Sequence, residues 1–327
     1  MKTAVIYHYY ELDLKYKENL IFFLSNAILP HIEYFFYISA SCSAELPNLP
    51  NIKYIQIENR NHDFGGVLNF YKSGLHHGFD AYIFINSSVR GPFLPNYLSC
   101  NWDEILTSRL SKEIGMVGSS INLLPPSSSH TNSFRNSFGY AEPYIHVQTT
   151  AYALSLDAYQ LIEAKGFFDF DKTLNKHELI DRYEILLSQI LMNNNLSISS
   201  ILPTYEKFSL GNRSINTNKT SVNGDPLYKG AFYGRTLSPF ESLFVKTNRN
   251  MISNRDLASV TLTSLANKYN AGALTKDGIE LFERSSNQLS EGEVIQIRKD
   301  QLISVLKHIK TSNPHFAETL IQILQTS

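Results

Sequence analysis

NHDFGGVLNFYKSGLHHGFDAYIFINSS, residues 61–88, contains a loop, a helix and a strand in immediate succession. A polar, glycine-containing loop covers 59–66, and the pattern after it predicts a helix over roughly 67–78. An apolar run over 80–88 then predicts a strand that ends in a polar tip. This order of loop, helix and buried strand is typical of a sheet whose parallel strands are joined by crossover helices.

The residues before this stretch continue the same alternation. Apolar runs predict further strands, at 3–8, 33–40 and 52–58. A helix is expected over 16–29, ended by Pro30. The alternation indicates an α/β fold with a mostly parallel sheet flanked by helices. Ligands bind such sheets beyond the carboxyl ends of the strands, where the loops 59–66 and 86–92 should lie.

The pattern after residue 88 is less regular. Further strands are predicted, at 114–121, 145–155 and 196–205. A strongly amphipathic helix is expected over 177–194. Residues 125–139, PPSSSHTNSFRNSFG, are polar and predict a loop, and so do residues 210–240, which are rich in Asn, Gly, Ser and Lys.

Beyond about residue 250 the pattern predicts helices alone. We therefore expect a domain over 1–250 and a C-terminal helical appendage over 251–327. These helices could form a homo-oligomer. The segment IRKDQLISVLKHIKT, 297–311, also has basic residues beside apolar positions, which suits contact with a membrane surface, although an ordinary packing helix is the simpler interpretation.

Composition limits the classes of function. The formal charge of −1 lacks the basic bias of a nucleic-acid-binding protein, and hydrophobic residues make up 43% of the chain, which is enough for a core. Only two cysteines are present, Cys42 and Cys100, so neither a disulfide framework nor a cysteine zinc site is expected. We see no signal peptide and no run of about 18 apolar residues, so we expect a cytoplasmic protein that would meet a lipid-linked acceptor at the inner face of the membrane.

A resemblance to a known class of enzyme rests on several blocks in a fixed order. After residues 61–88 come four further stretches: VRGPFLP (89–95), HVQTTAYALS (146–155), DRYEILLSQIL (181–191) and YGRTLSPFESLFVKTNR (233–249). This set resembles GT-A glycosyltransferases of bacterial polysaccharide synthesis, including those of the rhamnan-synthesis F-like kind. The resemblance covers roughly residues 1–250 and implies a GT-A-like, Rossmann-like fold, a nucleotide-sugar donor and transfer to a glycan or lipid-linked glycan acceptor.

The resemblance also shows a departure at the tip of the strand over 80–88. GT-A enzymes carry an Asp-x-Asp metal motif there, and this chain has Asn86, Ser87 and Ser88. Neutral side chains hold a divalent cation weakly, so we expect no metal cofactor; Mn²⁺ or Mg²⁺ would be the ions if one were used. The leaving diphosphate would then need basic side chains, for which the candidates are Lys72, Arg90, Lys229, Arg235, Lys246 and Arg249. The alternative is that the tip only closes a turn and Arg90 is a solvated charge.

The loop before the first helix of this block supplies further donor candidates. Asp63 could accept a hydrogen bond from a base or ribose, and Gly65 and Gly66 would let the backbone approach a ligand closely. The alternative is an ordinary helix N-cap and a tight turn. Late in the chain, the turn at 223–226 precedes Lys229, Tyr233 and Arg235, which could close over a diphosphate or form an ordinary surface loop.

Glu184 is the candidate general base, because the resemblance places a carboxylate at this point of a helix near the acceptor. Inverting glycosyl transfer needs a base for the acceptor hydroxyl proton. Asp181 is three residues earlier and can share the same helix face. The alternative is a solvated helix face.

His146, Gln148 and Thr150 alternate along a predicted strand and are candidates for the acceptor groove, although a strand histidine is more often structural. The ten histidines include no His-Glu-x-x-His motif, and the adjacent His76 and His77 point to different sides, so no zinc site is expected.

These observations favour an enzyme, a hexosyl- or related sugar transferase that inverts the anomeric centre. Two other classes stay open. A nucleotidyltransferase on a similar sheet would need paired acidic metal ligands, which the strand ends do not offer. A non-catalytic glycan-binding or scaffold domain derived from a transferase would also fit the absence of Asp-x-Asp.

Overall fold

The computed structural model describes residues 1–205, 207–209, 218–289, 299–307 and 314–326. Part of the predicted loop over 210–240 lies outside these residues, as do both ends of the predicted helix over 297–311. None of the described helices is long and apolar enough to cross a membrane.

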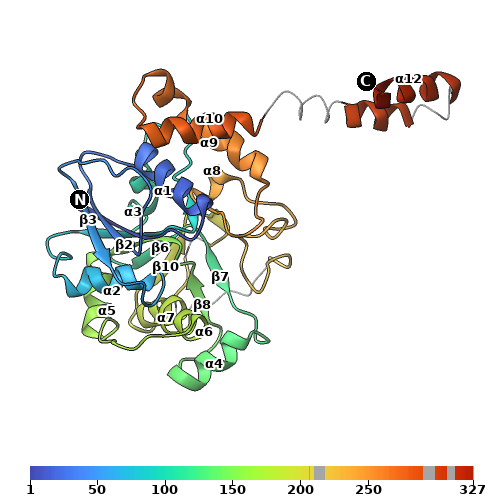
Figure 1. Ribbon diagram of the computed structural model, residues 1–327. Coiled ribbons are helices and arrows are strands. Elements are labelled where there is room, and N and C mark those ends of the chain that lie inside the picture. Colours follow the sequence, from blue (N-terminus) through green and yellow to red (C-terminus); the bar gives the residue numbers. More distant parts are fainter. Residues whose placement is uncertain (206, 210–217, 290–298, 308–313, 327) are drawn as a thin grey trace.

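A seven-stranded sheet forms the centre of the molecule, in the order β10-β6-β9-β4-β1-β2-β3 (Figure 1). Its strands are β1 Thr3–Tyr10, β2 Glu33–Ser39, β3 Ile52–Ile57, β4 Ala81–Asn86, β6 Ile114–Gly118, β9 Ala151–Ser155 and β10 Ser197–Ser200. β9 runs antiparallel to both of its neighbours, and the other pairs are parallel. The predicted α/β fold with a mostly parallel sheet is therefore confirmed.

The predicted strand over 145–155 is wrong as a single element. Its first part, β8 Ile145–Val147, pairs with β7 Ile121–Leu123 in a separate ribbon, and the chain turns before β9 begins. The side chain of Val147 packs on Gly118 so closely that a Cβ atom there would lie 2.2 Å from Val147 Cγ1. The ribbon therefore crosses over the end of β6 and does not extend the sheet.

Helices cover both faces of the sheet. In chain order they begin with α1 Leu14–Asn26, α2 Phe64–Lys72, α3 Trp102–Thr107, α4 Ser129–Phe138, α5 Leu156–Ala164, α6 Lys176–Leu179 and α7 Leu186–Asn193. The Asp13 side chain caps α1, accepting hydrogen bonds from the backbone N–H groups of Lys15 at 2.9 Å and Tyr16 at 3.2 Å. This helix ends before Pro30, as predicted.

Two helical features differ from the sequence predictions. Residues 125–139 were expected to form a loop, but α4 occupies most of them and ends at Gly139, which has a left-handed backbone. The sequence is polar, but Phe134 is buried and its ring lies 4.8 Å from that of Tyr144, so tertiary packing holds a helix of low propensity. The predicted helix over 177–194 is interrupted by a π-helical turn, η1, at Ile180–Ile185.

After residue 226 the chain returns to the carboxyl end of β4. The short helix α8 Pro239–Ser242 leads into β11 Val245–Lys246, which pairs antiparallel with β5 Val89–Arg90 just beyond β4. Two later helices, α9 Asn254–Asn270 and α10 Lys276–Asn287, lie over α1 (Figure 1). Lys268 donates to the backbone oxygen of Ser25 at 2.6 Å, and Arg284 forms an ion pair with Glu18 at 3.2 Å.

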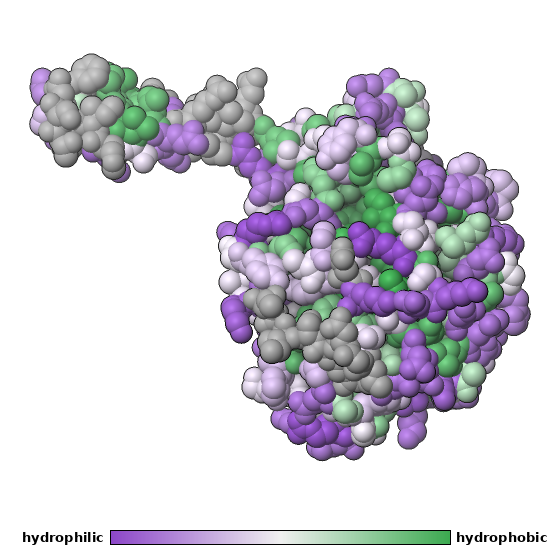
Figure 2. Space-filling view, turned by 180° about the vertical axis from the view of Figure 1, so that it is seen from behind, coloured by the Kyte–Doolittle hydropathy of each residue, from purple (hydrophilic) through white to green (hydrophobic). Residues whose placement is uncertain are grey.

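The last helix, α12 Pro314–Thr326, stands apart from the body in Figure 1. From the opposite side, the surface of the body is a mixture of polar and apolar side chains, with an apolar area in its upper half (Figure 2).

Aromatic rings fill the space between α1 and the sheet, where Tyr7 packs on Phe23 at 4.8 Å and on Phe36 at 5.3 Å between ring centroids.

Candidate functional site

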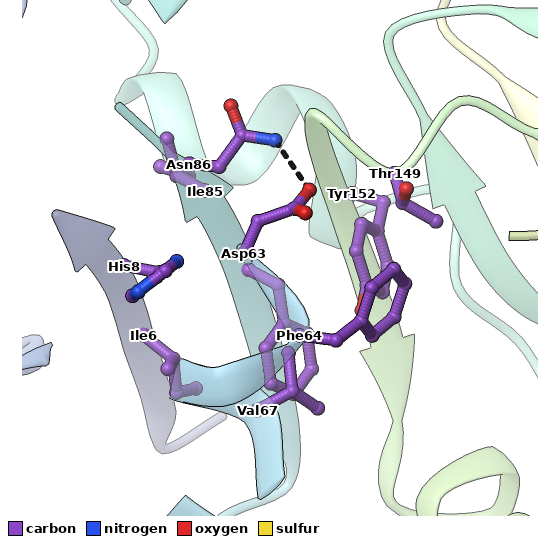
Figure 3. A pocket seen from close by; sticks show the side chains of 10 residues that line it. Ile6, His8, Asp63, Phe64, Val67, Ile85, Asn86, Thr149 and Tyr152 are labelled. Carbon is purple, nitrogen blue, oxygen red and sulfur yellow. Dashed lines mark hydrogen bonds between the residues drawn. The ribbon is translucent and has the colours of Figure 1, made fainter. Parts of the chain in front are cut away.

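A small pocket lies at the carboxyl ends of β1 and β4 (Figure 3). β1 and β4 are parallel and in register, so His8 pairs with Asn86 at the same edge of the sheet. β9 runs the other way, so the turn before it reaches this edge as well, and Thr150 O accepts the Asn86 N–H at 3.1 Å. The pocket is lined by Ile6, His8, Asp63, Phe64, Val67, Phe84, Ile85, Asn86, Thr149 and Tyr152.

Asp63 and Asn86 form the polar wall of this pocket. The Asn86 side-chain amide donates to Asp63 Oδ2 at 2.9 Å (Figure 3), and the amide oxygen accepts the Ser88 N–H at 3.1 Å. Asp63 precedes α2 but makes no capping bond, so the N-cap alternative does not describe its side chain. Burial raises the pKa of Asp63, while the hydrogen bond from Asn86 and the charge of Lys246 lower it.

The other residues at the strand tip hold the turn. Ser87 is buried, its hydroxyl donates to the backbone oxygen of Tyr10 at 3.2 Å, and it accepts the Tyr10 N–H at 3.2 Å. Ser88 donates its N–H to Asn86, as described above. Both serines therefore have local partners of the kind that a plain turn requires.

Gly65 and Gly66 serve the packing of α2. A Cβ atom at Gly65 would lie 2.3 Å from the carbonyl oxygen of Arg60, and one at Gly66 would lie 2.9 Å from His8 Cβ. Only residues without a side chain let the start of α2 pack this closely on β1 and on the preceding loop. The glycines thus place Asp63 at the pocket.

Two stacked aromatic rings hold together the segments that carry Glu184 and Asp63. Tyr183, in η1, stacks on Phe64, with ring centroids 4.0 Å apart and an interplanar angle of 17°. Glu184 and Asp63 are the chain neighbours of these two rings. Burial is the main cause of the raised pKa of Tyr152, and the charges of Asp63 and Glu184 raise it further. The stacked rings therefore place Glu184 near Asp63, and Glu184 itself is not among the residues that line the pocket.

The Glu184 carboxylate is partly buried and has no hydrogen-bond or ion-pair partner within the described residues. Burial raises its pKa to about 7, the charge of Asp63 acts in the same direction, and Lys246 and Arg249 oppose them. A carboxylate poised near neutral pH is suited to proton transfer.

Lys246 supplies positive charge at the same place. Thr247 donates its backbone N–H to Ser88 O at 2.9 Å, which holds β11 against the strand tip. Burial lowers the pKa of Lys246, as does Arg249, whereas the carboxylates of Glu184, Asp225 and Asp63 raise it. The Lys246 ammonium has no hydrogen-bond or ion-pair partner in the part of the chain that the structure describes, so its charge is available to a ligand.

Arg90, a donor candidate next to the strand tip, faces elsewhere. In the β5–β11 ribbon it pairs with Val245, so it lies on the opposite face from Lys246. It is 2% exposed and donates to Glu18 Oε2 at 2.7 Å and to Asn19 Oδ1 at 3.0 Å. It is therefore a buried connection between β5 and α1, not the solvated charge of the alternative.

The other basic and aromatic candidates are spread over the surface. Lys72 lies at the far end of α2 from Asp63 and contacts Asp171 at 3.4 Å. Arg235 is exposed and paired with Glu241 through bonds of 2.7 and 2.6 Å. Lys229 and Tyr233 are exposed on the same late segment. Arg249, by contrast, forms an ion pair with Asp225 and stacks over the Tyr228 ring at 4.4 Å. Its charge lowers the pKa of Glu184.

The acceptor candidates are buried. His146, Gln148 and Thr150 are 2%, 3% and 5% exposed, and Thr150 meets the pocket through its backbone. Asp181 does not face Glu184, because its carboxylate lies 2.6 Å from His130 on α4. The wider turn of a π-helix separates side chains that an α-helix would bring to one face, so the predicted Asp181–Glu184 face is not formed.

Several residues at the site were not predicted from the sequence, among them Tyr152, His8 and Asp225. Tyr152 and His8 line the pocket, and Asp225 pairs with Arg249 beside it. Asp225 lies in the Asn-Gly-Asp-Pro turn, which the sequence marked only as a turn. Tyr152 follows the polar residues 148–150, so its place beside the strand tips depends on the antiparallel direction of β9.

Comparisons with known proteins find similarity among solved structures. No family model matches the sequence, and no curated protein matches it. Among solved structures, the chain is similar to the mannosyltransferase PcManGT from Pyrobaculum calidifontis in complex with GDP-Man and Mn²⁺. The two are 13% identical, and the match covers 88% of this chain and 85% of that chain with a TM-score of 0.35. At this level neither the sugar, the nucleotide nor the metal of that complex extends to this protein.

Proposed function

We propose that this protein is a glycosyltransferase that moves a sugar from a nucleotide-sugar donor to a glycan or lipid-linked glycan acceptor. The observation that carries the proposal is the Glu184 carboxylate, which has no partner among the described residues and whose pKa is raised to about 7, beside Lys246 and the Asp63–Asn86 pair. An acid and a base without partners at the ligand-binding edge of an α/β sheet indicate a reaction site.

The proposed reaction is a direct displacement with inversion. Glu184 takes the proton of the acceptor hydroxyl while the acceptor oxygen forms a bond to the anomeric carbon. The bond from that carbon to the donor phosphate oxygen breaks, and the nucleoside diphosphate leaves with the electron pair. Lys246 and Arg249 offset the negative charge that develops on the leaving group.

Asp63 and Asn86 are assigned to the nucleoside part of the donor. Asp63 can accept from a ribose hydroxyl or a base N–H, and Asn86 fixes the orientation of its carboxylate. Phe64 and Tyr152 add ring surface to the same pocket.

The residues at the strand tip do not fit the divalent cation that GT-A enzymes usually carry there. Asn86 directs its amide N–H to Asp63, and its oxygen accepts from both the N–H and the hydroxyl of Ser88, so the amide offers no free oxygen ligand. Lys246 adds positive charge beside the carboxylate. We therefore propose a metal-independent transferase in which basic side chains take the place of the cation, of the rhamnan-synthesis F-like kind that acts in polysaccharide synthesis at the bacterial surface.

The first test is a thermal-shift screen of UDP, GDP, CMP, dTDP and their sugars, each with Mn²⁺ and with EDTA. A shift with one nucleotide that is equal in EDTA is expected, because a ligand that binds only the folded state raises its stability. Release of nucleotide from the matching sugar donor would then identify an enzyme. Binding without any release would favour the non-catalytic domain, and a shift that requires Mn²⁺ would overturn metal independence.

A further inference from the structure

A second group of reactive side chains surrounds Asp181, three residues before Glu184. The Nδ1 atom of His130 lies 2.6 Å from Asp181 Oδ1, and Nε2 of His177 lies 3.7 Å from Oδ2 of the same carboxylate. One nitrogen from each imidazole and one carboxylate oxygen all lie within 4.8 Å of one another. We refer to His130, His177 and Asp181 as the histidine cluster.

Local geometry explains why the histidine cluster forms. His177 and Asp181 are four residues apart across the junction of α6 and η1, so both side chains lie on one face. α4 packs against η1 and brings His130 and Ser133, three residues apart, onto the same carboxylate. The Ser133 hydroxyl also lies 3.0 Å from His177 Nε2.

The separations suit a metal ion. With bonds of about 2.0–2.2 Å to nitrogen and oxygen, neighbouring ligand atoms of a tetrahedral ion lie about 3.3 Å apart. The imidazole nitrogens lie 2.6 Å from Oδ1 and 3.7 Å from Oδ2 of Asp181, and the three ligand atoms lie within 4.8 Å of one another, so side-chain rotations could bring them to this value. The Asp181 side chain is 7% exposed and that of His177 is 45% exposed, which leaves one side open to solvent for entry.

A third histidine beside the histidine cluster supports a ligand there. His146 is 2% exposed, and its Nδ1 atom has no hydrogen-bond partner among the described residues. β8, which carries His146, packs against η1, which carries Asp181. The rings of His130 and His177 stack with centroids 4.1 Å apart and an interplanar angle of 15°. Each of these two imidazole rings can offer a nitrogen lone pair to a shared cation.

We infer that the histidine cluster binds a divalent transition-metal ion such as Zn²⁺, and that the ion fastens α4 to the turn that carries Glu184. Two imidazoles and one carboxylate suit first-row transition metals, whereas Mg²⁺ and Ca²⁺ prefer oxygen ligands alone. Three protein ligands leave a fourth position for water. The inference goes beyond the proposed function and does not depend on it, because none of the ligands belongs to the strand-tip site.

The test uses the full chain without a histidine tag, freed of metal by a chelator and titrated with Co²⁺. We expect one ion per chain with the visible absorption bands of a coordinated Co²⁺, displaced by Zn²⁺, which binds such sites more tightly. His130→Ala and His177→Ala should each weaken binding by about 100-fold or more, because removal of a ligand exceeds the effect of an outer-shell change. His77→Ala, an exposed histidine elsewhere, is the matched control and should bind as the unaltered protein does.

Two results would overturn the inference. One is unaltered protein that takes up neither Co²⁺ nor Zn²⁺ in a one-to-one ratio. The other is Co²⁺ binding that His130→Ala and His177→Ala leave unchanged. His177 is half-exposed, so His177→Ala should keep its fold, as a circular dichroism melt can check, and it carries the test even if His130→Ala does not fold. Retention of binding in Glu184→Gln is expected, which separates this site from the proposed transferase chemistry.

Discussion

Asp181 and Glu184 belong to the same π-helical turn, yet their surroundings differ in kind. Asp181 is surrounded by donors, with His130 and Ser133 hydrogen-bonded to its carboxylate. Glu184 has no such partner within the described residues, and its pKa is raised to about 7. A carboxylate whose hydrogen bonds are already made holds a structure or a metal, whereas one that is left without them is available for a substrate proton.

The largest expected effect is on turnover. Glu184→Gln removes the base but keeps the shape of the side chain, so turnover should fall by about 10²- to 10⁴-fold while donor binding is unchanged. Glu178→Gln is the matched control, because Glu178 is exposed on the same helical segment and Gln can keep its capping box. Steady-state kinetics and calorimetric donor titration measure the two quantities. Equal turnover in the two variants would contradict the assignment of Glu184 as the base.

The next effect concerns stability. Arg90→Met breaks a buried ion pair with Glu18 and leaves the buried Asn19 without its donor, so the free energy of unfolding should fall by about 3–5 kcal/mol. Arg235→Met removes an exposed ion pair with Glu241 and should cost about 1 kcal/mol or less. Urea unfolding compares the two. A similar loss from both would contradict the structural role given to Arg90.

The sequence offered two sources of positive charge for the diphosphate, Lys246 on β11 and Lys229 on the late segment, and a variant of each distinguishes between them. Lys246→Met should weaken binding of the nucleoside diphosphate by about 10- to 100-fold, because a charge-assisted contact contributes about 1.5–3 kcal/mol. Lys229→Met, on an exposed segment, should change the affinity by less than about threefold. Isothermal titration of both variants is the measurement. The reverse order would place the diphosphate under the late loop and not at β11.

A smaller effect links the Glu184 site to pH. The pKa of Glu184 is raised from the ordinary 4.5 to about 7 in the folded protein, so the folded state binds more protons between these values and loses stability as pH rises from 4.5 to 7. Gln has no such titration. At pH 8, Glu184→Gln should therefore be more stable than the unaltered protein by about 1–3 kcal/mol, with no difference at pH 4. Urea unfolding at the two pH values checks this, and a gain that is equal at both would contradict it.

The sequence predicted the sheet and the polar tip of β4, because buried strands are continuous apolar runs and the polar residues at their ends are visible. It could not predict α4, because Ser and Asn favour turns. The helix is stabilised by the burial of Phe134, which depends on tertiary packing. It named both Arg90 and Lys246 but could not choose between them. The choice depends on the pairing of β5 with β11, far apart in the chain, which sends the two side chains to opposite faces.

The histidine cluster could not be predicted from the sequence, for a similar reason. The spacing of His177 and Asp181 is a local signal, but His130 joins them only because α4 packs against η1. The π-helical turn had no clear signal in the sequence either, and it is the feature that gives Asp181 and Glu184 different surroundings. Local patterns therefore predicted the candidate residues, and long-range packing determines which of them lie together.

The most direct test of the account is the pH dependence of kcat/KM for the unaltered protein and for Glu184→Gln, measured with the donor found in the thermal-shift screen. A base that must be ionised loses activity below its pKa, so kcat/KM should fall tenfold per pH unit below about pH 7 in the unaltered protein. The residual activity of Glu184→Gln should lack this decrease. The same decrease in both proteins would show that another group provides the base.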